Sequence, residues 1–245
     1  MTSASRDRPS HIAISRAYAA LYEVAARLFL SEMDDHAFAR FAEGGAHAVL
    51  DRLSGDAAFA EPAAALLERF RAPWDRAARL ALAAEYGRLF HGAGGRRAVP
   101  PSQSAFLNEA SHGAPWRAMT ALLADSGAAV PAGCSEPADH IAIQLLLAAH
   151  LHRTHADAAA AGDTAAATTA SDRLDRLRAD HLAAWGPQFC ARVAEADRDG
   201  FYRAAADFVA RLLDLDTDAA DENGEQKPTM PRTPSAKQRE LRERP

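Results

Sequence analysis

Apolar residues recur at spacings of three and four along most of the chain, which is the period of an amphipathic α-helix. The first stripe of this kind follows Ser10, whose hydroxyl suits the N-cap position of a helix. Its members are Ile14, Tyr18, Leu21, Ala25 and Leu28. The pattern predicts a helix from the Ser10 cap to near Ser31, with one face toward a core.

Shorter helices are expected between this first helix and residue 91. Glycines and a proline divide this part of the chain, and the predicted helices lie between them, at 35–43, 46–53 and 62–71. Asp75 is suited to cap one more helix. The apolar face of that helix contains Tyr86 and ends in a Leu-Phe pair, Leu89 and Phe90.

Two segments interrupt the helical pattern. From His91 to Ser104 there is no apolar period, and the segment includes a glycine cluster and the double proline Pro100-Pro101. A second predicted loop, at 128–137, has the sequence AAVPAGCSEP. Between the two loops, a helix with Pro115 in its first turn is expected to stop near Gly127.

The second half of the chain opens with its most apolar helix, predicted from Ser135-Glu136-Pro137 to about Ala160. Alanine, threonine and glycine dominate 156–170, which indicates an exposed helix end and a linker. The next helix is expected to begin at Ser171 and to turn at Gly186-Pro187 into another. A last helix is predicted from about Gly200 to Leu215.

Composition supports an all-α fold. Hydrophobic residues make up 48% of the chain, yet only ten of its 245 residues are valine or isoleucine, so strand-forming residues are scarce. We expect a single-domain bundle of about ten helices over residues 11–215, preceded by a flexible N-terminus at 1–10. The segment 216–245 has few apolar residues and is predicted to be a disordered tail.

The charge of the chain excludes some partner classes. A formal net charge of -5 provides no basic stripe, so neither nucleic acid nor an anionic membrane is an expected partner, whereas a cationic ligand is easier to accommodate. The longest apolar run, 138–151, is broken by polar residues and is too short for membrane insertion, which favours a cytoplasmic protein. Cys134 and Cys190 form neither a disulfide framework nor a zinc motif and are expected to be small apolar residues.

Several motifs suggest chemistry without supporting it, and no cofactor or metal is expected. HGAGGRR lacks the lysine, the Ser or Thr and the preceding strand of a phosphate-binding loop, so its internal Arg96-Arg97 pair is interpreted as part of a solvated loop. HLHRTH, at 150–155, spreads its histidines around a helix, and an exposed set is favoured over a metal site. Glu109 and His112 give a single ExxH pair, whereas a di-iron bundle needs two.

The sequence EPADH is more specific, because it places Glu136, Asp139 and His140 at the start of an apolar helix. Acidic residues in a first helical turn complement the helix dipole, and that alone could explain both carboxylates. His140 could be either a hydrogen-bonded core residue or a ligand contact. Both interpretations stay open on physical grounds.

Four ordered blocks together resemble one protein family. They are YGRLFHGAG, PPSQSAF, EPADHIAIQLLLAAHL and HLAAWGPQFCARVAEADRDGFYRAAADFVARLL, within roughly Ile14 to Leu215. This order of motifs is similar to that of the TorD/DmsD family of redox-enzyme maturation chaperones. The resemblance implies an all-helical cytoplasmic protein that binds the twin-arginine leader of a molybdopterin (DMSO-reductase-type) catalytic subunit, delays export until the cofactor is inserted, and catalyses no reaction.

The resemblance also implies a leader-binding site. By motif position the site consists of Tyr86, Leu89, Phe90, Pro100, Pro101, Ser104, Phe106, Glu136, Asp139 and His140. Asp139 is expected to accept a hydrogen bond from a leader arginine, with His140 orienting it. The chain departs from the family pattern at Ser102, where an aromatic residue is usual, and at Gly92-Ala93, where Gly-Pro often occurs.

Two other function classes are weighed against this one. An enzyme could use Asp139 and His140 as an acid/base pair, for example to hydrolyse a nucleotide, but the sequence offers no nucleophile or phosphate cradle. A structural subunit retained in the mature oxidoreductase is the third possibility.

Overall fold

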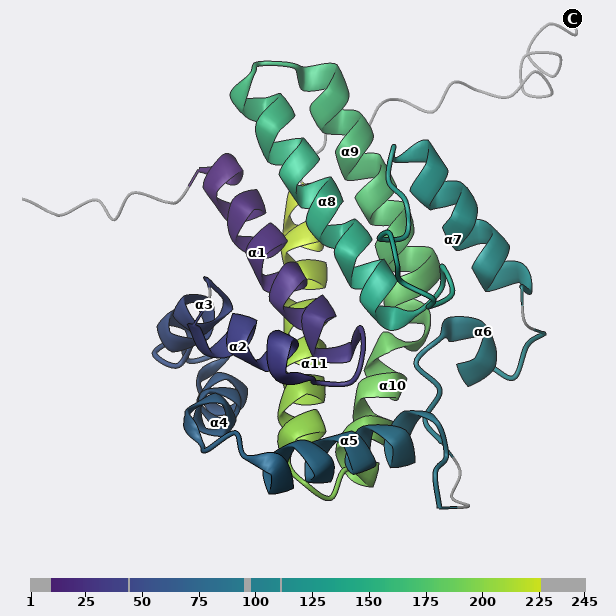
Figure 1. The fold of residues 1–245 in the computed structure, drawn as a ribbon. Helices are drawn as coiled ribbons and strands as arrows, with labels where there is room; N and C mark the ends of the chain where they lie inside the picture. The colour runs from purple at the N-terminus through teal and green to yellow at the C-terminus, as the bar shows by residue number, and fades with distance from the viewer. Residues whose placement is uncertain (1–9, 44, 95–97, 111, 226–245) are drawn as a thin grey trace, which may run out of the picture.

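The structure is a computed structural model that describes residues 10–43, 45–94, 98–110 and 112–225, with side chains up to residue 219. The prediction of an all-α fold is confirmed, since the described elements are all helical (Figure 1). In chain order they are α1 (His11–Phe29), α2 (Asp35–Glu43), α3 (Gly45–Leu53), α4 (Ala60–Arg71), α5 (Arg76–Phe90), α6 (Gln103–Phe106), α7 (Ala114–Asp125), α8 (Ile141–Ala160), α9 (Thr164–Leu177), the π-helical turn η1 (Arg178–Leu182), α10 (Ala183–Ala196) and α11 (Phe201–Glu225).

The long helices form a bundle around which the shorter ones are arranged. Helix α1 packs along α8, α8 packs along α9, and α11 packs against both α1 and α10. Figure 1 shows α5 crossing one end of this bundle, with α2 to α4 on one flank and α6 and α7 on the other. None of the helices in the described part of the chain combines the length and apolar character needed to cross a bilayer.

An aromatic cluster fills the interior where α1, α5, α10 and α11 meet. Phe29 of α1 lies edge-on to Phe90 of α5 and Phe189 of α10, with ring centroids 6.1 and 5.6 Å apart. Tyr202 of α11 meets Phe90 at 5.2 Å, also edge-on. Burial of each ring stabilises the fold by about 2 kcal/mol, and the edge-on geometry contributes roughly 1 kcal/mol more for each pair. The cluster therefore fixes α5, the helix that leads into the candidate site.

Two predicted helix starts are confirmed in detail. The Ser10 hydroxyl accepts a hydrogen bond from the backbone N–H of Ala13 at 3.2 Å, and the Asp75 carboxylate accepts one from Ala78 at 2.9 Å. Both are N-cap bonds that satisfy a free donor in the first turn. The predicted loop at 91–104 is interrupted by the short helix α6, which begins at Gln103.

The linker predicted at 156–170 is wrong. Helix α8 ends at Ala160, and α9 begins at Thr164 after a tight turn in which Gly162 has a φ of 77° and Asp163 caps the new helix. Ala167 and Ala170 are buried. Small side chains here let α9 pack closely on α8, so a composition that resembles a linker forms an interhelical contact instead.

The turn predicted at Gly186-Pro187 is also wrong. The helix continues through both residues, and the π-helical turn η1 lies just before Pro187, which has no N–H to donate. A Cβ atom at Gly186 would lie 2.9 Å from Cδ1 of Leu213. The glycine therefore serves the close approach of α10 to α11 and does not end a helix.

The C-terminal helix is longer than the sequence indicates. It runs to Glu225, ten residues past the predicted boundary at Leu215, so the expected disordered tail cannot begin at residue 216. Asp216 is 1% exposed and accepts hydrogen bonds from Tyr22 and Arg178. The predictions made for 1–9, for 226–245 and for Arg96-Arg97 lie outside the described residues.

Candidate functional site

The two motif blocks PPSQSAF and EPADH are fastened together by their main chains. The N–H of Gln103 donates to the carbonyl of Asp139 at 3.0 Å, and the N–H of Ile141 donates to the carbonyl of Pro101 at 2.8 Å. These bonds form an isolated antiparallel bridge between Ser102 and His140. The segment 98–106 and the turn 136–140 therefore form one unit at the start of α8.

Asp139 holds this unit together from inside. One carboxylate oxygen, Oδ2, accepts from the backbone N–H of Ser104 at 2.8 Å and also from the Ser104 hydroxyl. It thus satisfies a free donor at the N-terminus of α6. The residue is 0% exposed, so the carboxylate is not available to a ligand in this structure and the expected role as an arginine acceptor does not fit. Asp139 is a positioning residue.

His140 caps α8 and does not belong to its first turn, because the helix begins at Ile141 and not at Ser135. Its Nδ1 accepts from the N–H of Ala142 at 3.1 Å, which leaves the proton of the neutral ring on Nε2. Burial lowers the pKa of His140 to about 4, so the ring is neutral near pH 7. Nε2 lies 3.6 Å from Oε2 of Glu136 and has no hydrogen-bond partner among the described residues.

A buried amide network supports the same unit, and sequence reasoning missed it. Gln144 donates to the side chain of Gln103 at 3.0 Å and to the carbonyl of Asp139 at 3.1 Å. The Gln103 side-chain oxygen also lies 2.8 Å from Nδ1 of His181 in η1, and Trp185 donates to Gln144 at 3.1 Å. The π-helical turn is thereby tied to the loop of the candidate site.

The ten expected site residues divide by exposure. Seven of them are buried and form the interior of the site, namely Tyr86, Leu89, Phe90, Ser104, Phe106, Asp139 and His140. The other three are partly exposed, namely Pro100, Pro101 and Glu136, the last with 28% of its side chain accessible. The structure therefore brings all ten into one region, but only these three reach its surface.

The pKa of Tyr86 responds to negative charges at that surface. Its pKa is raised to about 12, first by burial and then by the negative charges of Glu136 and Glu32. Glu32 is exposed and lies in the connection between α1 and α2. Nothing in its sequence context marks it as a site residue, because its only signal is spatial.

The histidines of HLHRTH make separate contacts and do not converge. His150 lies 3.1 Å from the carbonyl of Ser126, and Nδ1 of His155 lies 3.0 Å from the Ser15 hydroxyl. His152 stacks on Tyr18 and Tyr22. No group of three metal-binding side chains occurs within the ranges that the structure describes.

The other residues that could take part in catalysis do not form a catalytic arrangement. Asp139 and His140 each bond to another partner and are both inaccessible, which removes the geometry that an acid/base pair needs. Cys190 is buried, and burial raises the pKa of its thiol to about 12, whereas Cys134 is only half-buried. The site is suited to binding and not to catalysis.

The chain is similar to known proteins of one family. Residues 54–191 match the family described as nitrate reductase delta subunit. The chain is 29% identical to the chaperone protein TorD of Shewanella loihica, over 84% of this chain and 93% of that protein. It is 28% identical to TorD of Vibrio cholerae, over 83% and 92%, and 29% identical to TorD of Escherichia coli K12, over 81% and 94%.

Proposed function

Since the chain belongs to the nitrate reductase delta subunit family, and within it to the TorD/DmsD-type maturation chaperones, we propose that it binds the twin-arginine leader of one molybdopterin oxidoreductase of DMSO-reductase type. The chain is a system-specific chaperone of molybdoenzyme maturation and not an enzyme. We propose in addition that the client is of DMSO-reductase type, that its leader is what binds, and that binding takes place in the cytoplasm.

One observation supports leader binding above the others: main-chain hydrogen bonds join the segment 98–106 to the turn 136–140. These bonds place the partly exposed Pro100 and Pro101 in the same unit as Glu136, whose negative charge acts on the buried Tyr86. Prolines present apolar surface at little entropic cost, and a carboxylate provides the charge that an arginine needs. A leader combines an apolar stretch with arginines, so its chemistry matches both halves of this surface.

The chaperone acts by occupying the leader. While the leader is bound, the export machinery cannot engage the client, and the apo form stays available for cofactor insertion. The rigid interior of the site contributes by holding the exposed residues in a fixed arrangement, which lowers the entropy that binding must overcome. No step in this cycle requires a chemical reaction by the chaperone.

Calorimetric titration tests the proposal. The full chain is titrated with the twin-arginine leader peptide of a molybdopterin oxidoreductase from the same organism, and saturable one-to-one binding is expected. A scrambled peptide of the same composition is the control. The proposal fails if the genuine leader binds no better than the scrambled one and if no such catalytic subunit is recovered with the tagged chaperone from its native cells.

Recovery experiments also separate the chaperone from a structural subunit. A maturation chaperone is expected with the apo catalytic subunit and to be absent from the purified mature oxidoreductase. Equal amounts of this chain in the mature enzyme would favour the structural alternative.

A further inference from the structure

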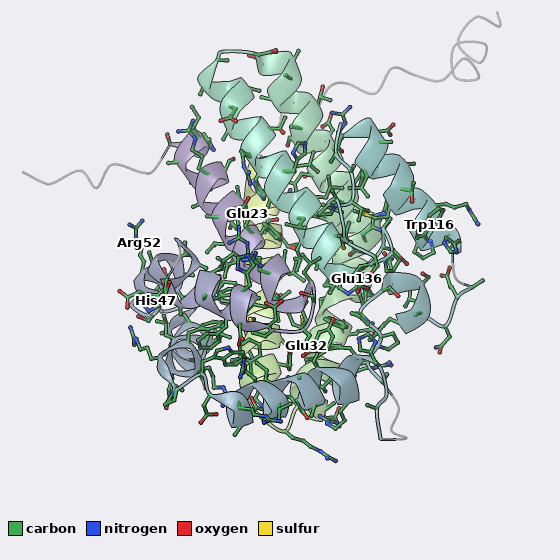
Figure 2. All side chains as sticks on the ribbon, viewed as in Figure 1. Glu23, Glu32, His47, Arg52, Trp116 and Glu136 are labelled. Atoms are coloured by element: carbon green, nitrogen blue, oxygen red, sulfur yellow. The ribbon has the colours of Figure 1, made fainter. Side chains whose placement is uncertain are left out.

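Two acidic residues from distant parts of the chain act on the same buried side chain of the candidate site, Tyr86. Glu136 belongs to the turn before α8, and Glu32 belongs to the connection between α1 and α2, next to the buried Met33 that anchors this connection. Figure 2 labels both side chains on the face of the molecule that is turned toward the viewer. Both raise the pKa of the Tyr86 hydroxyl, in addition to the effect of burial, so both carboxylates act on one buried group.

Neither carboxylate has a cationic partner among the described residues. Some acidic side chains on the described surface are paired, as Glu23 is with Arg153 and Asp35 is with Arg79, whereas others, such as Glu61 and Asp218, form no ion pair within the described residues. Glu32 makes no ion pair within those ranges, and the only contact of this kind for Glu136 is the neutral ring of His140 at 3.6 Å. Two uncompensated negative charges near one hydroxyl repel each other, and a ligand with two positive charges would relieve that repulsion.

Unpaired buried donors provide a second, independent indication of a ligand. His140 is 0% exposed, and its Nε2 points toward Glu136 without reaching hydrogen-bond distance. The hydroxyl of Tyr202, whose pKa is raised first by burial and then by charges that include Glu32, is likewise buried and unpaired in the described structure. Buried polar groups are normally satisfied, so orphans beneath an acidic surface indicate a site that is completed on binding.

We propose that Glu32 and Glu136 each bind one guanidinium group of the leader's consecutive arginines. This inference rests on the proposed function, and it adds Glu32 as the residue that binds the second arginine. Arginine matches a carboxylate with two parallel N–H donors, whereas lysine offers a single point charge. A small movement of Glu136 toward His140 would form the missing hydrogen bond and orient the carboxylate, so His140 is a positioning residue here.

The test compares three single variants that change charge equally. Glu32→Gln and Glu136→Gln remove the proposed acceptors, and Glu23→Gln removes a partly exposed carboxylate on α1 that is paired with Arg153. Leader binding is expected to weaken about fivefold in Glu32→Gln and about tenfold in Glu136→Gln, since the latter is less exposed. Glu23→Gln is expected to bind within about twofold of the wild type. Circular dichroism verifies that all three are folded.

Leader peptides with replaced arginines test whether the arginines bind to these two carboxylates. Replacing both arginines by lysine is expected to weaken wild-type binding more than it weakens binding to the Glu32→Gln/Glu136→Gln double variant, since the double variant has lost the matched acceptors. If the wild type binds the leader and Glu32→Gln binds it as tightly as Glu23→Gln does, the inference about Glu32 is wrong while the proposed function stands. If the wild type binds no leader at all, the proposed function itself fails.

Discussion

Asp216 is the residue whose replacement should damage the fold most clearly. Its carboxylate accepts from the Tyr22 hydroxyl at 2.6 Å and from Nε and Nη2 of Arg178 at 2.8 and 2.6 Å. Nε2 of His152 lies 3.4 Å away. One side chain therefore ties α11 to α1, to α8 and to the π-helical turn.

The expected cost of Asp216→Asn follows from that burial. Removing one partner of a buried ion pair costs about 3 to 5 kcal/mol, because the remaining charge stays buried without compensation. Asparagine keeps one oxygen acceptor, so we expect the lower end, about 3 kcal/mol. For a chain of this size that corresponds to a fall in melting temperature of roughly 10 °C.

Urea unfolding measures this directly. Asp218→Asn is the matched control, since Asp218 is an exposed carboxylate on the same helix, and a change within about 0.5 kcal/mol is expected there. The slope of free energy against urea should stay the same in both variants. A loss below about 1 kcal/mol in Asp216→Asn would refute the argument that this buried pair holds α11 in place.

The pH dependence of the same variant gives a second check. Burial alone would raise the pKa of Asp216, but the nearby ring of His152 and the hydrogen bonds from Arg178 outweigh it and hold the pKa well below the ordinary value. The stability from this carboxylate is therefore fully present above the unfolded pKa of about 3.9 and is lost as the pH falls below it. The difference between wild type and Asp216→Asn should shrink in the same range.

Two further predictions concern the C-terminal helix and His140. A chain ending at Leu215 should lose at least as much stability as Asp216→Asn does. A chain ending at Glu225 should melt within about 2 °C of the full protein. If both truncated chains melt at the same temperature as the full protein, the packing of α11 is contradicted. Wild-type stability should fall as the pH decreases from about 6.5 toward about 4, since His140 stays neutral in the folded state while the unfolded chain takes up a proton. His140→Asn keeps a capping oxygen, and its free energy of unfolding, measured with urea, should depend less on pH in this range. An unchanged pH dependence in this variant would argue against the depressed pKa of His140.

Local signals in the sequence were enough for most helices. Ser10 and Asp75 mark helix starts because an N-cap bond involves residues only three positions apart. The errors at 156–170 and at Gly186-Pro187 have another origin. Small residues and a proline lower the intrinsic tendency to form a helix, but packing against α8 and α11 overrides that tendency, and no local pattern records the partner helix.

The candidate site was only partly predictable for the same reason. The motifs that motif order selected lie in one region of the structure, but their order does not indicate which side chains face inward. Asp139 is buried because Ser104, far away in the sequence, supplies two donors to it. Glu32 was missed because its relation to Tyr86 exists only in the folded chain.

The division between buried and exposed motif residues also explains how the departures from the family pattern are tolerated. Ser102 joins the bridge to His140 through its main chain, so the fold does not depend on its side chain. Gly92, with a φ of 69°, keeps the backbone that this turn requires. Losing an aromatic ring at Ser102 therefore changes the surface offered to a client and leaves its support intact. Client choice in this chain should then depend on the few exposed groups, Pro100, Pro101, Glu136 and Glu32, which can change without unfolding the site beneath them.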